Sequence, residues 1–141
     1  MEIEKIMTAK TVCVDRSETV SAAARLMSRY NGGALPVTDE RGRLCGMLTD
    51  RDVALRCVAA GKDADKVLVR SIMTNAPCSL RPGQSCKEAV RAMIQNRVRR
   101  LPVTEQGRVV GMVSLGDLTQ DPETGSPQAL AGLYNQIHTA L

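Results

Sequence analysis

The sequence predicts an α/β (α+β) fold made of two copies of one βαββα unit. Three observations support this prediction. Short motifs recur in the same order, among them the heptapeptides GMLTDRD at 46–52 and GMVSLGD at 111–117. Each copy alternates helix-like and strand-like hydrophobic patterns. The length of 141 residues suits one domain or two closely packed halves with a substantial core.

The repeat has a nearly constant spacing. IMT occurs at 6–8 and again at 72–74, and LPVT occurs at 35–38 and again at 101–104. Both motifs return after 66 residues, and the heptapeptides return after 65. Such regularity over more than forty residues indicates an internal duplication. We therefore expect a first repeat over 1–66, a second over 67–125 and a C-terminal amphipathic helix over 126–141.

The first copy contains the signals of every element in turn. After a turn that follows IMT, TVCV reads as a short extended run, and Thr19 is placed to cap a helix that ends at Gly32 and Gly33. A glycine-containing loop then joins two strands into a hairpin-like pair. The expected elements after the first helix are the strands 34–38 and 44–49 and a helix over 50–60 capped by Thr49.

The second copy repeats this order. Ser85 and Glu88 have the spacing of a capping box at the start of its first helix. The helix after Ser114 is expected to be short, because DPETGSP interrupts it, and a new helix is expected to start at Ser126 and Pro127. The other expected elements are an extended run at 77–80, strands at 100–104 and 109–114, and an apolar helix side formed by Leu130, Leu133, Ile137 and Leu141.

Each heptapeptide combines groups that suit a ribose phosphate. Thr49 and Ser114 fall at the end of a strand, and Asp52 and Asp117 fall in the first helical turn that follows. A helix start favours anions, a hydroxyl can donate to a phosphate oxygen, and a carboxylate can accept from both hydroxyls of a vicinal diol. The glycine allows another group to approach the strand. The alternative is that each aspartate is only a helix cap.

With these motifs in order in both copies, the chain resembles a tandem pair of cystathionine β-synthase (CBS) domains, the Bateman module, of the small stand-alone bacterial type. The resemblance covers about Glu2 to Thr119. It implies two βαββα units related by pseudo-twofold symmetry and packed through their sheets. It also implies two clefts for adenosine-containing ligands such as AMP, ADP, ATP or S-adenosylmethionine, and a homodimer.

The resemblance also assigns roles to residues of this chain. It implies that Asp52 and Asp117 bind ribose and that Thr49 and Ser114 contact phosphate. It places two backbone stretches near the adenine and further residues along the opposite wall of the pocket. The backbone stretches are Thr11–Val12 and Pro77–Cys78, and the wall residues are Ala34, Pro36, Arg100 and Pro102.

The two copies differ in charge just before LPV. Arg99 and Arg100 occupy positions where related domains hold phosphates, whereas Gly33 and Ala34 occupy them in the first copy. If both sites bind, we expect them to be unequal, because guanidinium groups favour ligands with more phosphate charge. The alternative is that Arg97, Arg99 and Arg100 form a solvated face.

Composition argues against several other classes of function. The five cysteines are scattered and His138 is the only histidine, so we expect no metal site. Two tyrosines are the only aromatic residues, which argues against single-stranded nucleic-acid binding despite the formal charge of +4. No apolar run approaches the ~20 residues of a membrane span, and we expect a cytoplasmic protein without a signal peptide.

The favoured hypothesis is a regulatory module that binds an adenine nucleotide and acts in trans on an unknown target. A structural dimerisation scaffold with vestigial clefts and a nucleic-acid-binding protein are the alternatives. An enzyme is not expected, because no nucleophile–base pair, metal cluster or P-loop is visible in the sequence. No obligatory cofactor is expected either.

Overall fold

The computed structural model describes residues 1–30 and 32–138, which form two compact units of mixed α/β structure. One unit consists of Val12–Pro77, and the other consists of Met1–Thr11 together with Cys78–Leu141. We call them the first-repeat unit and the second-repeat unit. The expected end of the last helix, including Leu141, lies outside the described residues.

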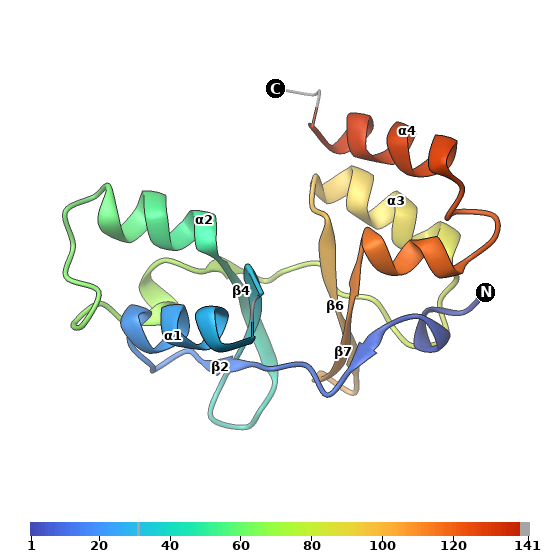
Figure 1. Cartoon of the computed structure of the whole chain (residues 1–141). Coiled ribbons are helices and arrows are strands. Elements are labelled where there is room, and N and C mark those ends of the chain that lie inside the picture. Colours follow the sequence, from blue (N-terminus) through green and yellow to red (C-terminus); the bar gives the residue numbers. More distant parts are fainter. Residues whose placement is uncertain (31, 139–141) are drawn as a thin grey trace. The chain divides into compact units, whose positions relative to one another are not determined.

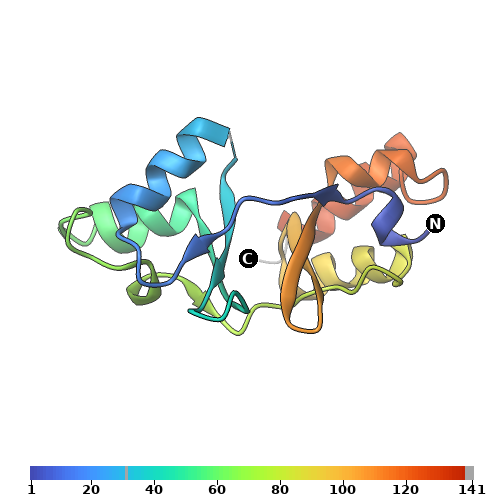
Figure 2. The same ribbon diagram turned by 90° about the horizontal axis from the view of Figure 1, so that it is seen from below.

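The first-repeat unit contains a four-stranded sheet in the order β2-β3-β4-β5. β3 (Ala34–Thr38) and β4 (Leu44–Thr49) form the expected antiparallel hairpin, and β2 (Val14–Asp15) runs parallel to β3. α1 (Val20–Tyr30) and the helix after β4 cover the same face of this sheet (Figures 1 and 2). That second helix begins as α2 (Asp50–Asp52) and continues as the π-helix η2 (Val53–Val58).

The second-repeat unit contains a three-stranded sheet in the order β1-β7-β6. β6 (Arg100–Glu105) and β7 (Arg108–Ser114) form its hairpin, and Leu80 adds a parallel bridge to Val103. α3 (Cys86–Asn96) packs against this sheet, and α4 (Pro127–His138) packs against α3 (Figure 1). The interruption predicted from DPETGSP is confirmed, because the 3-10 helix η4 (Gly116–Gln120) stops before it.

Each unit has its own apolar core on the helix side of its sheet. Alternate strand residues face helix residues at i, i+3 and i+7, which explains why both periodicities were visible in the sequence. In the first-repeat unit the core includes Val20, Ala23, Met27, Val37 and Leu48. In the second-repeat unit the equivalent core of Cys86, Ala89, Met93, Val103 and Val113 is extended by Leu133 and Ile137 of α4.

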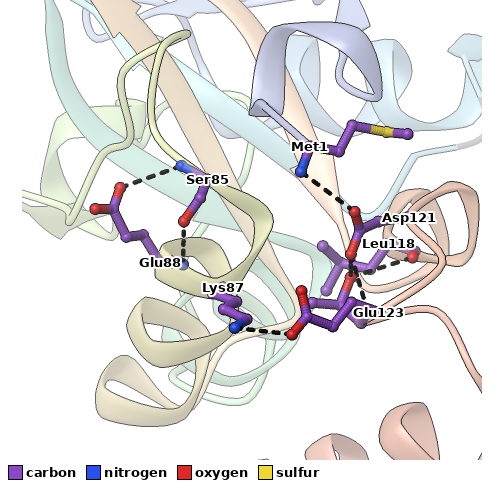
Figure 3. A network of polar contacts seen from close by, with 8 residues as sticks. Met1, Ser85, Lys87, Glu88, Leu118, Asp121 and Glu123 are labelled. Atoms are coloured by element: carbon purple, nitrogen blue, oxygen red, sulfur yellow. Dashed lines mark hydrogen bonds and ion pairs between the residues drawn. The ribbon is translucent and has the colours of Figure 1, made fainter.

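Helix caps follow the sequence signals closely. The Thr19 hydroxyl oxygen accepts from the backbone N–H of Ala22 at 3.1 Å, and Ser126 does the same for Ala129 at 3.1 Å. Ser85 and Glu88 form the predicted capping box, in which each side chain accepts from the other residue's backbone N–H (Figure 3). These bonds satisfy amide groups that the first turn of a helix leaves without partners.

The two IMT segments were expected to lead into a turn, but a short strand comes first. β1 (Thr8–Ala9) pairs with β7, and β5 (Thr74–Asn75) pairs with β4. The turn follows each strand, at Lys10 (φ 55°) and Ala76 (φ 45°). Each IMT segment thus completes the sheet that holds the other repeat's heptapeptide, so the compact units differ from the repeat boundaries of the sequence.

The heptapeptide glycines make this pairing possible. A Cβ placed on Gly111 would lie 2.7 Å from the Met7 sulfur and 2.8 Å from the Thr8 carbonyl oxygen. A Cβ on Gly46 would clash with the Met73 sulfur and would lie 3.0 Å from the Thr74 carbonyl oxygen. The sequence prediction that glycine admits a close neighbour is therefore confirmed. The neighbour is the short strand from the other repeat, β1 at Gly111 and β5 at Gly46.

The buried carboxylate of Asp121 holds the loop before α4 in place by hydrogen bonds and an ion pair. Asp121 accepts from both the backbone N–H and the hydroxyl of Thr124, each at 2.8 Å, and its other oxygen lies 3.5 Å from the Met1 ammonium nitrogen (Figure 3). The Thr124 hydrogen bonds, and the ammonium group after them, hold the pKa of Asp121 below its usual value.

We predict that Gly111→Ala lowers the free energy of unfolding by about 1–3 kcal/mol, because the added carbon would force β1 away from β7. Urea denaturation followed by circular dichroism measures this change. Gly132→Ala is the control: Gly132 lies in α4 with open space around it, so alanine there should stabilise by about 0.5–1 kcal/mol. Equal effects of the two substitutions would contradict the close approach.

We also predict that the stabilisation by Asp121 is lost at acidic pH. A carboxyl group whose pKa is lowered on folding stabilises the folded state above its unfolded pKa of about 3.9, and this stabilisation disappears as pH falls through the lowered value. Urea unfolding of Asp121→Asn and wild type should therefore differ at pH 7, and the difference should shrink as the pH falls below about 3.9. Glu123→Gln, which removes an exposed ion pair with Lys87, should change little at either pH.

Candidate functional site

The two heptapeptides form the same corner in the two units, where a strand ends and a helix begins. We define the first corner as Gly33, Ala34, Thr49, Asp50 and Asp52, and the second corner as Arg99, Arg100, Ser114, Leu115 and Asp117. Each corner lies wholly within one unit. The predicted phosphate and ribose residues are therefore brought together in both copies.

The backbone geometry of the corners is the same. Ala34 lies opposite Thr49 in the β3–β4 ladder, as Arg100 lies opposite Ser114 in the β6–β7 ladder. The next residue continues the match, because Asp50 donates its N–H to the Gly33 carbonyl at 2.9 Å. The equivalent bond runs from Leu115 to Arg99 at 2.8 Å.

In both corners the aspartate and the hydroxyl residue cap each other. The Thr49 N–H donates to Asp52 Oδ2 at 2.9 Å, and the Asp52 N–H donates to Thr49 Oγ1 at 3.1 Å. The same pair joins Ser114 and Asp117 at 2.8 Å and 3.1 Å. The capping bonds expected from the sequence are thus present in both copies, and any ligand must be bound by what the caps leave over.

The caps leave part of each polar group available. The Thr49 and Ser114 hydroxyls accept a hydrogen bond, so the O–H of each can still donate. Asp52 and Asp117 each use one oxygen for the cap, and a carboxylate offers about four lone-pair sites in all. A hydroxyl donor and a carboxylate acceptor therefore remain side by side in each corner.

The second oxygen of the carboxylate has a different neighbour in each corner. Asp52 Oδ1 lies 3.7 Å from Arg56 Nε, and Arg56 also donates from Nη1 to the Ile72 carbonyl at 3.1 Å. The residue of the second copy that corresponds to Arg56 is Asp121, which binds Thr124 instead. Within the described residues, Asp117 has only its capping bonds.

The charged groups beside the corners also differ. Arg99 and Arg100 are exposed beside Ser114, and Leu115 follows it. In the first corner, the Asp50 carboxylate lies over Gly33, where an added Cβ would be 2.8 Å from Asp50 Oδ2. Sequence reasoning missed Asp50 and Arg56, although Arg56 follows Asp52 at the i+4 spacing of a helical ion pair.

The remaining predicted site residues lie at two kinds of place. Thr11, Val12, Pro77 and Cys78 are the residues at which the chain passes from one compact unit to the other. Pro36 and Pro102 are buried within β3 and β6. The Thr11 hydroxyl donates to the Thr8 carbonyl at 3.1 Å, which closes the turn after β1.

Two hollows in the described residues lie away from the corners. One, of about 1040 Å³, is lined by the loop before α3 and the β6–β7 turn, and includes Arg81, Glu88 and Gln106. The other, of about 370 Å³, lies between β2 and α1 and includes Cys13, Asp15 and Arg25. The two linings correspond in part, since Ser79, Arg81, Gln84 and Glu88 match Cys13, Asp15, Glu18 and Ala22, but the hairpin turn lines only the first hollow.

Comparison with known sequences decides the family. The profile of the CBS domain matches residues 3–58 and 69–121, so both repeats are covered. This chain belongs to the CBS-domain family. The resemblance stated from the motifs is therefore confirmed. No helix in the described part of this CBS-domain chain is long and apolar enough to cross a bilayer.

Individual relatives match nearly the whole CBS-domain pair. CBS domain-containing protein YhcV of Bacillus subtilis is 42% identical over 136 residues, which cover 96% of this chain and 95% of the relative. The crystal structure of Hypoxic Response Protein I with two coordinated zinc ions is 34% identical with a TM-score of 0.80, covering 86% of this chain and 98% of that one. The structure of CBSX2 in complex with AMP shares the fold at 24% identity and a TM-score of 0.72, covering 84% and 93%.

We predict that Thr49→Ala lowers the free energy of unfolding by about 1 kcal/mol, because it removes the hydroxyl that accepts from the Asp52 N–H. Thr49→Ser keeps that oxygen and should stay close to wild type. Thermal and urea unfolding measure both variants. Equal stability of the alanine and serine variants would show that the cap contributes nothing.

Proposed function

We propose that this CBS-domain pair is a regulatory module that binds an adenosine-containing ligand, of which AMP, ADP, ATP and S-adenosylmethionine are the candidates. The observation that carries the proposal is the duplicated corner, in which a hydroxyl and a carboxylate are held in the same geometry twice. The AMP bound to CBSX2 supports an adenine nucleotide as the ligand class for this fold.

The second corner offers the most complete set of groups for a nucleotide. Asp117 has an oxygen to accept from ribose hydroxyls, and Ser114 has an O–H to donate to phosphate. Arg99 and Arg100 add two guanidinium groups, whose bonds to phosphate are charge-assisted and can be bidentate. The adenine would lie against aliphatic side chains, because the whole chain has only two aromatic residues.

Regulation follows if the ligand prefers one arrangement of the protein over another. A ligand shifts a conformational equilibrium only by its difference in affinity for the two states. We propose that this shift is passed to a separate target protein in trans. We assign no catalytic residue and no obligatory cofactor to the chain.

One surface feature favours self-association as part of this function. Leu55 and Val58 lie three residues apart on η2 and are 51% and 67% exposed. Large apolar side chains exposed on the same short helix favour contact with another protein surface. We propose a homodimer, and a scaffold that only dimerises is the second candidate. The arginines alone favour nucleic-acid binding, but the whole chain has only two aromatic residues on which bases could stack.

The test is isothermal titration calorimetry of the full chain with AMP, ADP, ATP and S-adenosylmethionine. We predict binding of at least one of them and at least a tenfold loss of affinity in Asp117→Ala, because the ribose hydroxyls lose their acceptor. Arg99→Ala with Arg100→Ala should weaken ADP and ATP more than AMP, because the missing guanidinium groups face phosphate.

Glu88→Ala is the matched control. It removes the carboxylate of another capping box in the same unit, so it costs similar helix stability without touching the corner. Full retention of nucleotide binding in this variant is expected. If none of the four ligands binds wild type, or if Asp117→Ala and Glu88→Ala lose affinity equally, the proposed function is wrong.

A further inference from the structure

The first corner carries negative charge where the second corner carries positive charge. Gly33 corresponds to Arg99, and Asp50 corresponds to Leu115. The Asp50 carboxylate fills the space over Gly33, within 2.8 Å of where a Cβ there would lie. A carboxylate thus stands in the first corner at the place from which a guanidinium side chain extends in the second.

The ribose-binding candidate of the first corner is also engaged by the chain itself. Asp52 Oδ2 accepts from the Thr49 N–H, and Oδ1 faces Arg56 Nε at 3.7 Å. Arg56 is fixed from its other side by the Ile72 carbonyl. Its own side chain is 54% exposed, so the ion pair alone is weak, whereas Asp52 is only 13% exposed.

From these differences we infer that Asp50 and Arg56 make the first corner exclude phosphorylated nucleotides, so that each chain binds one nucleotide, at the second corner. This inference rests on the proposed function and deepens it by assigning specificity to named residues. Asp50 repels the phosphate charge, and Arg56 competes with ribose hydroxyls for Asp52.

The expected pattern in calorimetry with ADP follows directly. Wild type should bind one equivalent per chain, Asp117→Ala should bind none, and Asp52→Ala should still bind one with affinity within threefold of wild type. In the Asp117→Ala background, Gly33→Arg with Asp50→Leu transplants the second corner's groups and should restore one equivalent. Adding Arg56→Met to that variant should tighten binding further.

Glu40→Arg in the same background is the control for net charge, because it changes the charge by +2, as the transplanted pair does. It removes an exposed acid from the same unit, in the turn at the opposite end of the β3–β4 hairpin from Ala34 and Thr49. It should restore no binding. Circular dichroism melts of every variant, with Asp52→Ala and Asp117→Ala compared directly, establish that loss of binding is not loss of folding.

The outcomes separate the two proposals. Two equivalents of ADP with similar affinity in wild type, retained binding in Asp117→Ala, or no gain in the transplanted variant would each overturn the exclusion while leaving nucleotide binding intact. If Arg56→Met alone, in the otherwise wild-type chain, weakens ADP binding, Arg56 holds phosphate. That result would also overturn the exclusion. Absence of binding by any candidate ligand in wild type would instead reject the proposed function and this inference with it.

Discussion

The fold depends on the close approach of two short strands to two glycines. β1 crosses Gly111 and β5 crosses Gly46, at distances that leave no space for a Cβ. Each crossing completes a sheet and brings a buried isoleucine, Ile6 or Ile72, into the core of that unit. Sheet completion, core filling and the position of each corner at the end of β4 or β7 therefore depend on the same contact.

The corners show how one set of groups can serve stability and binding at once. The carboxylate and hydroxyl of each pair first satisfy amide groups at a helix start, which keeps both side chains in fixed rotamers. A ligand that meets groups already fixed in this way loses less conformational entropy on binding. This double use also means that the sequence alone does not distinguish a capping aspartate from a ligand-binding one, because both roles require the same residue types at the same spacing.

Local features could be predicted from the sequence, whereas features set by distant contacts could not. The Ser85–Glu88 box, the Thr49 and Ser114 caps and the break before Ser126 each depend on a few neighbouring residues, and all were predicted. The strands Thr8–Ala9 and Thr74–Asn75 are too short to show a two-residue period, and their partners lie in the other repeat. Asp50 became relevant only when the register placed it over Gly33. Whether the corners bind nucleotide remains a prediction, because the caps account for the same residues.

Each repeat depends on the other for one strand of its sheet, because β1 pairs with β7 and β5 pairs with β4. A polypeptide cut at the repeat boundary would leave Gly46 and Gly111 facing water, each beside an open sheet edge that invites aggregation. A cut after Thr11 and another after Pro77 would release a segment that carries a complete sheet and its own core. The sequence repeat and the compact folding unit of this protein are thus offset by about eleven residues. An ancestor with a single repeat would therefore have completed its sheet by exchanging its first strand with a second copy of the chain.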